Sequence, residues 1–330
     1  MKLRKIICIL LSLFMLTALL ACEGDSGETR KLTVSEVTHS VFYAPQYAAI
    51  ALGFFEDEGL DIELVNGGGA DNVMTAVLSG QVDIGFAGPE ACIYVVNEGK
   101  AEHPRVFAQL TKRDGSFIIS REKSKNFDYS EMKGARLIGG RAGGVPYMTL
   151  KYVLNEYGLT ENDLNIDTSI EFNNMVAAFT GGIGDYVTAF EPTASLLEAQ
   201  GAGYVVASVG ADSGEIPYTA YFAGSELIKK EPQTIAAFTR AIYRAQQWIA
   251  EADSAEIART IAPFFDDTDE ELLISAIDRY RQIDAWSADP LLTEDSLNNL
   301  MNVMEFSGEL SERPAYENVV YTDAAREVMK

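Results

Sequence analysis

Apolar and polar residues follow one another in two different periods along the chain. Residues 31–37 (KLTVSEV) alternate with a period of two, which is typical of a β-strand. Residues 44–60 (APQYAAIALGFFEDEGL) have the apolar spacing of a helix that ends at Gly59. Residues 61–65 (DIELV) return to a strand pattern. The first part of the chain therefore predicts a strand, a helix and a second strand.

The same order of elements continues further along the chain. Residues 67–80 combine a glycine-rich loop with a helix that Asp71 would cap and Gly80 would end. Residues 82–88 (VDIGFAG) are almost continuously apolar, as expected for a parallel strand covered on both faces. Strands that alternate with helices predict an α/β fold with mainly parallel sheets. Further strands are expected at 105–111, 116–122, 135–140, 185–190 and 203–209, and further helices at 145–159 and 192–201.

The last third of the chain has a different, helical character. Residues 218–224 (YTAYFAG) are expected to return the chain toward its first part, and Pro232 then stands at the start of a long helix. Asp269 and Thr293 are candidate caps of two more helices. We expect this region to cover the first part of the fold. The apolar face of its long helix consists of Ile235, Phe238, Ile242, Ala245 and Ile249.

An internal repeat indicates two similar lobes. Residues 72–91 can be placed on residues 174–193 without a gap, and each copy reads helix, glycine, aspartate, strand and acidic loop. About 300 residues also exceed one ordinary hydrophobic core. We therefore predict a first lobe at 32–114, a second lobe at 115–225 and a return to the first lobe at 226–330. The identical pairs are Asn72/Asn174, Ala76/Ala178, Gly80/Gly182, Asp83/Asp185 and Ala87/Ala189.

The first 21 residues have the pattern of an export signal. A basic start is followed by an apolar run at 6–20, which is shorter than the ~20 residues that span a bilayer. The run ends in Leu-Leu-Ala-Cys and resembles a bacterial lipobox, which predicts cleavage before Cys22 and lipid attachment to it. Residues 22–31 would then be a polar tether between the membrane and the folded lobes. The predicted location is the extracytoplasmic face of the cell membrane.

Charge and cysteine content narrow the possible functions. The chain has 26 basic and 49 acidic side chains, and loss of Lys2, Arg4 and Lys5 with the signal leaves 23 − 49 = −26. Such a charge disfavours nucleic-acid binding. Cys92 is the one cysteine after residue 22, so no disulfide is expected in the lobes. Two histidines and one cysteine in scattered positions do not predict a metal site or a cofactor.

Several residues at predicted strand ends are candidates for ligand binding. Ser40 could hydrogen-bond a ligand or cap a turn, and Tyr43 could stack on a ligand or pack in the core. Gly144 precedes a helix N-terminus that could receive a polar group, and Arg141 beside it is a ligand cation or a surface charge. Ligands of open α/β sheets bind at the carboxyl ends of the strands. The full set of expected ligand-binding residues is Ser40, Tyr43, Gly88, Glu90, Gly144, Tyr147, Phe190 and Glu191.

Residues 39–64 (HSVFYAPQYAAIALGFFEDEGLDIEL) carry a resemblance to a known family, which extends more loosely to DYVTAFEP at 185–192. The chain resembles the solute-binding lipoproteins of ABC importers for thiamine-pyrimidine precursors, aliphatic sulfonates, taurine and nitrate. This resemblance implies the two-lobed type II periplasmic binding fold, with the ligand in the cleft between lobes. It also implies a permease and an ATPase as partners, and a monomeric binding protein.

The two acidic loops decide the expected ligand. A carboxylate in a closing cleft needs a cationic or donor-rich partner, because an unpaired buried charge is too costly. If Glu90 and Glu191 both face the cleft, they favour a flat heteroaromatic amine such as a thiamine pyrimidine precursor and disfavour sulfonate or nitrate. In the alternative interpretation they are solvated loop carboxylates or helix-start residues.

Other functions remain as alternatives at this point. A sulfonate-, taurine- or nitrate-binding protein would have the same fold. The resemblance also reaches a pyrimidine synthase, but its cysteine-rich iron motif does not occur here. Glu90 and Glu191 could also be an acid/base pair of the kind used by glycosidases. No further catalytic constellation accompanies them, so we expect a binding protein without catalytic residues.

Overall fold

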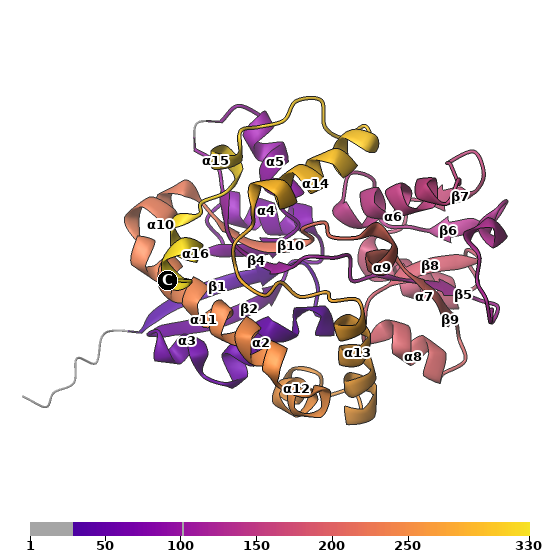
Figure 1. Cartoon of the computed structure of the whole chain (residues 1–330), viewed down its shortest axis with the longest axis horizontal. Helices are drawn as coiled ribbons and strands as arrows, with labels where there is room; N and C mark the ends of the chain where they lie inside the picture. Colours follow the sequence, from indigo (N-terminus) through magenta and orange to yellow (C-terminus); the bar gives the residue numbers. More distant parts are fainter. Residues whose placement is uncertain (1–28, 101) are drawn as a thin grey trace, which may run out of the picture.

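The protein was analysed as a computed structural model that describes residues 29–100 and 102–330. The predicted signal peptide, Cys22 and most of the tether lie outside the described residues. The chain forms two lobes side by side, each built on a five-stranded sheet flanked by helices (Figure 1). The predicted two-lobed α/β fold is therefore confirmed.

The first sheet has the strand order β2-β1-β3-β10-β4. Strands β1, β2 and β3 pair in parallel, whereas β10 pairs antiparallel with both β3 and β4. Four of its strands therefore point the same way and β10 points the opposite way. The bounds are β1 (Arg30–Glu36), β2 (Leu60–Asn66), β3 (Ile84–Ala87), β4 (Arg105–Thr111) and β10 (Thr219–Ala223).

The second sheet repeats this arrangement in the order β7-β6-β8-β5-β9. Here β5 is the strand that runs against its neighbours β8 and β9, while β6 pairs in parallel with β7 and β8. The short strand β7 had no counterpart among the expected strands. The bounds are β5 (Phe117–Ser120), β6 (Arg136–Ile138), β7 (Asn165–Asp167), β8 (Tyr186–Ala189) and β9 (Tyr204–Ser208).

Each sheet receives its reversed strand from a chain crossing. The chain passes from β4 directly into β5, and it returns from the second sheet into β10. Because β10 pairs within the first sheet, the expected end of the second lobe at residue 225 is too late. The return strand at 218–224 that the sequence predicts does join the first sheet.

Helices cover both faces of each sheet. One predicted helix at 44–60 is in fact two, because Gly53 adopts a left-handed conformation (φ 71°) that ends α2 before α3 begins. The helices that precede β10 in the sequence are η2 (Val41–Tyr43), α2 (Ala44–Ala51), α3 (Phe54–Asp57), α4 (Ala70–Leu78), α5 (Glu90–Asn97), η3 (Tyr129–Met132), α6 (Val145–Glu156), η4 (Phe172–Asn174), α7 (Met175–Thr180), α8 (Thr193–Ala199) and α9 (Val209–Ser213).

The C-terminal helices mostly pack on the first lobe, as Figure 1 shows for α11, α12 and α16. Two of them also reach the second lobe, since α13 contacts α8 and α14 contacts α6. This region therefore joins the lobes as well as covering the first one. Its helices are α10 (Ser225–Lys230), α11 (Pro232–Glu251), α12 (Ser254–Ile261), η5 (Ala262–Phe264), α13 (Glu270–Gln282), α14 (Glu294–Phe306), α15 (Tyr316–Val319) and α16 (Asp323–Val328).

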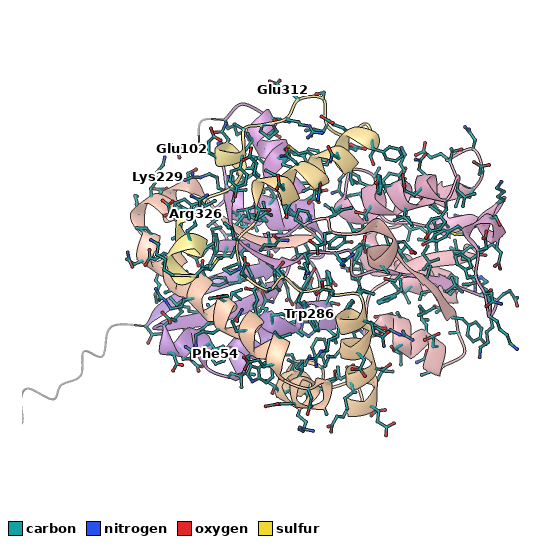
Figure 2. The ribbon with its side chains drawn as sticks, in the orientation of Figure 1. Phe54, Glu102, Lys229, Trp286, Glu312 and Arg326 are labelled. Carbon is teal, nitrogen blue, oxygen red and sulfur yellow. The ribbon has the colours of Figure 1, made fainter. Side chains whose placement is uncertain are left out.

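The two crossings lie against each other and form the connection between the lobes. The N–H of Ile216 donates to the Lys112 carbonyl (3.0 Å), and the N–H of Tyr218 donates to the Thr111 carbonyl (3.2 Å). The Tyr280 hydroxyl, from α13, donates to the Gly115 carbonyl (3.1 Å). Trp286, labelled beside the end of α13 in Figure 2, donates its indole N–H to the Phe42 carbonyl. Side chains of α13 and the residues after it therefore anchor the crossing to the first lobe.

Within the described ranges, no helix is both long and apolar enough to cross a bilayer.

Candidate functional site

A cavity lies between the lobes, at the carboxyl ends of the parallel strands. Its volume is about 80 Å³, so in this conformation it admits only a small solute. Both lobes contribute to its wall, which is the arrangement expected for a ligand site between two sheets. The residues that line it are Val37, Thr38, Tyr43, Gly69, Ala70, Gly88, Glu90, Gly140, Arg141, Gly144, Val145, Pro146, Phe172, Phe190, Tyr218 and Thr219.

Glu90 is the buried acidic residue of this wall. Strand β3 ends at Ala87, two residues connect it to α5, and Glu90 is the first residue of that helix. The side chain folds back over Gly88, because a Cβ added at Gly88 would stand only 1.9 Å from Glu90 Oε2. Gly88 therefore leaves the space in which the carboxyl group of Glu90 lies.

The two oxygens of Glu90 have different environments. Oε1 accepts a long hydrogen bond from the Val145 N–H (3.4 Å) at the start of α6 in the other lobe. Oε2 is buried and has no hydrogen-bond partner among the described residues. Burial raises the pKa of Glu90 to about 7, and hydrogen bonds from backbone N–H groups only partly oppose it. Glu90 thus presents an unsatisfied oxygen in a closed, poorly solvated space.

Three helices begin at the cavity. The N-termini of α4, α5 and α6 contribute Gly69, Glu90 and Gly144 to its lining, and none of the three is capped by the side chain of its own N-cap residue. Unpaired N–H groups and the helix dipole make such positions electropositive. Arg141 adds a positive charge, but it pairs with Asp71 of α4 across the cleft at 3.2 Å. The site therefore combines positive helix ends with one buried carboxyl group.

Aromatic rings form much of the remaining wall. Phe172 and Phe190 lie 5.8 Å apart between ring centroids, and Phe190 lies 6.1 Å from Tyr218. Tyr43 packs at 4.5 Å against Phe86 of the first sheet. Flat apolar faces of this kind suit stacking with an aromatic solute.

The lobes also touch directly around the cavity. The Tyr94 hydroxyl of α5 donates to the Gly143 carbonyl of the second lobe at 2.8 Å. The Ser40 hydroxyl of the first lobe donates to the Glu191 carbonyl at 2.6 Å. The Ser40 Oγ also accepts a hydrogen bond from the Phe42 N–H. Ser40 therefore joins the lobes and caps η2, and it does not line the main cavity. It lies in an adjacent hollow together with Glu191.

The expected pairing of Glu90 and Glu191 on one ligand is wrong. The Glu191 side chain is fully buried, and its two oxygens are already bonded within the protein. Oε2 accepts from the Ser195 N–H, while Oε1 accepts from the Ser195 hydroxyl and from Arg279 (2.7 Å). Its carboxylate thus serves the start of α8 and an ion pair with α13, and no free oxygen remains for a solute.

Two other tyrosines, of which Tyr147 was an expected ligand-binding residue, lie away from the cavity. Tyr147 does not line the cavity, because its hydroxyl points to Glu161 at 2.8 Å within the second lobe. Tyr221 is buried in the first lobe, where it stacks on Phe86 (4.3 Å) and donates to Gln46. Among the other expected residues, Tyr43, Gly88, Glu90, Gly144 and Phe190 do come together at the cavity.

Comparison with known proteins identifies the family of this chain. The model of the NMT1-like family matches residues 25–262. The chain belongs to this family. A relative from Bacillus subtilis, named "Putative binding protein YtlA", is 42% identical over 318 residues, which are 96% of this chain and 95% of that protein.

More distant relatives of this NMT1-like protein differ in their described roles. The alkanesulfonate-binding protein SsuA from Xanthomonas axonopodis pv. citri, solved with bound MOPS, superposes with a TM-score of 0.72 at 16% identity, covering 90% of this chain and 100% of that one. A 4-amino-5-hydroxymethyl-2-methylpyrimidine phosphate synthase from Aspergillus parasiticus is 25% identical over 138 residues, which are 41% of this chain and 39% of that enzyme. The first likeness shows the fold only.

Sequence reasoning missed some residues of the cavity in this NMT1-like protein. Thr38, Phe172, Tyr218 and Thr219 line it without having been singled out, and Arg141, for which a ligand contact and a surface charge were both open, lines it too. Thr38 directly follows the strand expected at 31–37, so its position at a strand end was a usable signal. Tyr218 is the first residue of the segment expected to return the chain at 218–224, but its pattern does not indicate which of its residues face the cavity.

Proposed function

We propose that this protein is the extracytoplasmic solute-binding component of an ABC importer and that it captures a small heteroaromatic amine by closure of the cleft. The observation that carries this proposal is the buried, unpartnered Oε2 of Glu90 in an aromatic-lined cavity between two lobes. The periplasmic binding fold and the kinship with a protein named as a binding protein support the general role.

The chemistry of Glu90 supports an amine ligand. A buried carboxyl oxygen without a partner costs stability, and a ligand that donates a hydrogen bond to it recovers that cost on binding. An aminopyrimidine supplies an exocyclic amine for this bond and a flat ring for the neighbouring aromatic side chains. Among the solutes that the family resemblance implies, a thiamine pyrimidine precursor best combines an amine with a flat ring.

The proposed setting follows from the N-terminal sequence. Cleavage after Ala21 and lipid attachment to Cys22 would hold a monomeric binding protein at the outer face of the membrane, on a short polar tether. A permease and an ATPase would then be its partners. These assignments rest on sequence pattern, since residues 1–28 lie outside the described part of the chain.

An anionic solute such as a sulfonate or nitrate is the second candidate. The three helix N-termini at the cavity favour an anion. Glu90 with its raised pKa could also donate a hydrogen bond in its protonated form. Against this candidate, Arg141 already has Asp71 as a partner, and an ionised Glu90 would repel the ligand. We therefore rank the amine first.

Catalysis has less support than binding. The carboxylate pair on which an acid/base interpretation depended does not exist, because Arg279 and Ser195 occupy Glu191. The cysteine-rich motif of the pyrimidine synthase is also missing, since the chain has three cysteines in scattered positions. We propose that the protein binds its solute without chemical change.

A thermal-shift screen tests the proposed function. Aminopyrimidines, thiamine, riboflavin, taurine, alkanesulfonates and nitrate would be compared at the same concentration. A solute present at about 100 times its Kd adds about 2.7 kcal/mol of stability, which raises the melting temperature by a few degrees. We expect this shift with an aminopyrimidine and not with taurine or alkanesulfonates. The reverse ranking would favour the anionic candidate, and turnover of a solute would contradict a pure binding role.

A further inference from the structure

Tyr218 and Asp114 lie on the two crossings that connect the lobes, which are joined by the hydrogen bond from the Tyr218 N–H to the Thr111 carbonyl (3.2 Å). Asp114 is in the segment between β4 and β5, and Tyr218 directly precedes β10. Both are buried, with exposed fractions of 0% for Asp114 and 4% for Tyr218. Tyr218 also forms part of the cavity wall, whereas Asp114 is not among its lining residues.

Both side chains carry a polar atom without a partner. Asp114 Oδ1 accepts hydrogen bonds from the Ser116 N–H and the Ser116 hydroxyl, each at 2.6 Å. Its Oδ2 and the Tyr218 hydroxyl are buried and have no hydrogen-bond partner among the described residues. Buried polar groups in folded proteins are nearly always paired, so two neighbouring exceptions beside a cavity indicate that a partner is still to arrive.

Buried and charged surroundings act in the same direction on the Tyr218 hydroxyl. Burial raises the pKa of Tyr218 well above its usual value, and the charges of Asp114, Tyr43 and Glu90 act in the same direction. The hydroxyl in turn lowers the pKa of Asp114, although burial outweighs this effect and raises that pKa to about 7. The geometry agrees with this, because the Tyr218 N–H and the Ile216 N–H bond the carbonyls of Thr111 and Lys112 just before Asp114, while Tyr218 lines the cavity together with Tyr43 and Glu90.

We propose that Tyr218 is a second ligand-contacting residue and that Asp114 is the positioning residue behind it. When the solute is bound, the Tyr218 hydroxyl donates its single hydrogen to Asp114 Oδ2. The lone pairs of the Tyr218 oxygen then face the cavity, where they accept a hydrogen bond from the solute. This inference rests on the proposed function and specifies the hydrogen-bonding pattern of its ligand.

The pattern defines the class of solute more narrowly than Glu90 alone. The ligand must present two hydrogen-bond donors from different parts of a flat molecule, one to Glu90 Oε2 and one to the Tyr218 oxygen. An aminopyrimidine that also carries a hydroxymethyl group meets this requirement, with the amine at Glu90 and the hydroxyl at Tyr218. An ionised sulfonate offers only acceptors and would meet lone pairs at Tyr218 and at an ionised Glu90.

Calorimetric titration with two matched probes tests this assignment. The probes are 4-amino-5-hydroxymethyl-2-methylpyrimidine and its 5-methoxymethyl ether, which keeps the ring and the amine but lacks the second donor. We expect the wild-type protein to bind the ether about tenfold more weakly, because one buried hydrogen bond is lost. In Tyr218→Phe, the affinity for the hydroxymethyl probe should fall about tenfold and the discrimination between the probes should disappear.

Two further variants separate positioning from general damage. Asp114→Asn can donate a hydrogen bond to the Tyr218 oxygen, so the Tyr218 hydroxyl would donate to the ligand. This variant should therefore accept the ether as well as the hydroxymethyl probe, which a merely structural role of Asp114 would not produce. Tyr221→Phe removes a buried tyrosine hydroxyl three residues along the chain but outside the cavity, and it should leave both affinities unchanged.

The outcomes distinguish this inference from the proposed function. If no probe binds the wild-type protein and thermal shift detects no other heteroaromatic amine, the proposed function fails and this inference fails with it. If both probes bind, Glu90→Gln weakens them and Tyr218→Phe keeps the wild-type discrimination, the inference alone is overturned. Should Tyr218→Phe not fold, equal binding of the two probes by the wild-type protein overturns it.

Discussion

Arg279 and Glu191 form an ion pair between the lobes, with 2.7 Å between Nη1 and Oε1. Arg279 lies on α13, which packs against η2 of the first lobe, while Glu191 stands just before α8 in the second lobe. The same guanidinium group bonds Ser195 and Glu198. One cation of the C-terminal region therefore holds the start of α8 and neutralises a carboxylate that is fully buried.

Removal of Arg279 should cost considerable stability. In Arg279→Ala, Glu191 would be a buried charge without its cationic partner, and breaking a buried pair in this way costs about 3–5 kcal/mol. Because Arg279 is itself partly exposed, we expect the free energy of unfolding to fall by about 3 kcal/mol, measured by urea titration. Arg313→Ala, which breaks an exposed pair with Glu305, should cost less than about 1 kcal/mol. Equal effects of the two substitutions would refute the role given to Arg279.

The stability of the ligand-free protein should depend on Glu90 in a defined pH range. The pKa of Glu90 rises from 4.5 to about 7 on folding, so between these values the folded protein holds a proton that the unfolded chain has released. The contribution of Glu90 to the free energy of unfolding is therefore present at pH 5 and is lost as the pH rises through 7. Relative to wild type, Glu90→Gln should gain about 2–3 kcal/mol between pH 5 and pH 8, measured by urea unfolding.

Two features of this experiment isolate Glu90. Asp114 is also a buried carboxyl group whose pKa is raised to about 7, but it is present in both proteins and cancels in the comparison. Glu251→Gln, at an exposed position at the end of α11, serves as the matched control and should follow the wild-type curve. Parallel curves for wild type and Glu90→Gln would mean that Glu90 is not held in a desolvated position.

Gly88→Ala should separate ligand binding from stability. The new methyl group would stand where Glu90 Oε2 now lies, so the flexible carboxyl group must move away from the cavity. We expect a change in stability of less than about 1 kcal/mol but a loss of aminopyrimidine affinity of about tenfold. The control is Gly224→Ala, since a Cβ at Gly224 meets no atom within 4 Å and its φ of −60° suits alanine. If Gly88→Ala bound the solute as wild type does, the geometry assigned to Glu90 would be incorrect.

The fold could be predicted from the sequence because its signals are local. Apolar runs such as residues 82–88 and the helical spacing of residues 145–159 depend on a few neighbouring positions, and both elements occur as expected. The repeat of residues 72–91 in 174–193 also has a structural basis. Strands β3 and β8 occupy the same place in their sheets, each at the centre beside the reversed strand.

The candidate site was only half predictable, because side-chain direction depends on single residues and distant contacts. In the repeat alignment Glu90 falls at position 18 after Asn72 (90 − 72 = 18), but Glu191 falls at position 17 after Asn174 (191 − 174 = 17). Glu90 is thus the first residue of its helix, whereas Glu191 lies just before the N-cap Pro192. The partner of Glu191 is Arg279, 88 residues further along the chain, and no local pattern reveals such a contact.

The choice between Tyr218 and Tyr221 shows the same limit. Successive residues of an extended chain face opposite sides, so these two tyrosines, an odd number of positions apart, cannot share a face. The sequence does not specify which face borders the cavity, because that depends on how the two crossings lie against each other. The structure places Tyr218 there and Tyr221 in the core of the first lobe.

The central claim is that Glu90 receives a hydrogen bond from a solute held between the lobes, and a crystal structure with the best-binding aminopyrimidine tests it most directly. The account predicts the ring in the cavity beside Phe190, with a ligand nitrogen at about 2.7–3.2 Å from Glu90 Oε2. A solute bound outside the cleft, or bound within it while Glu90 Oε2 still has no partner, would contradict the claim.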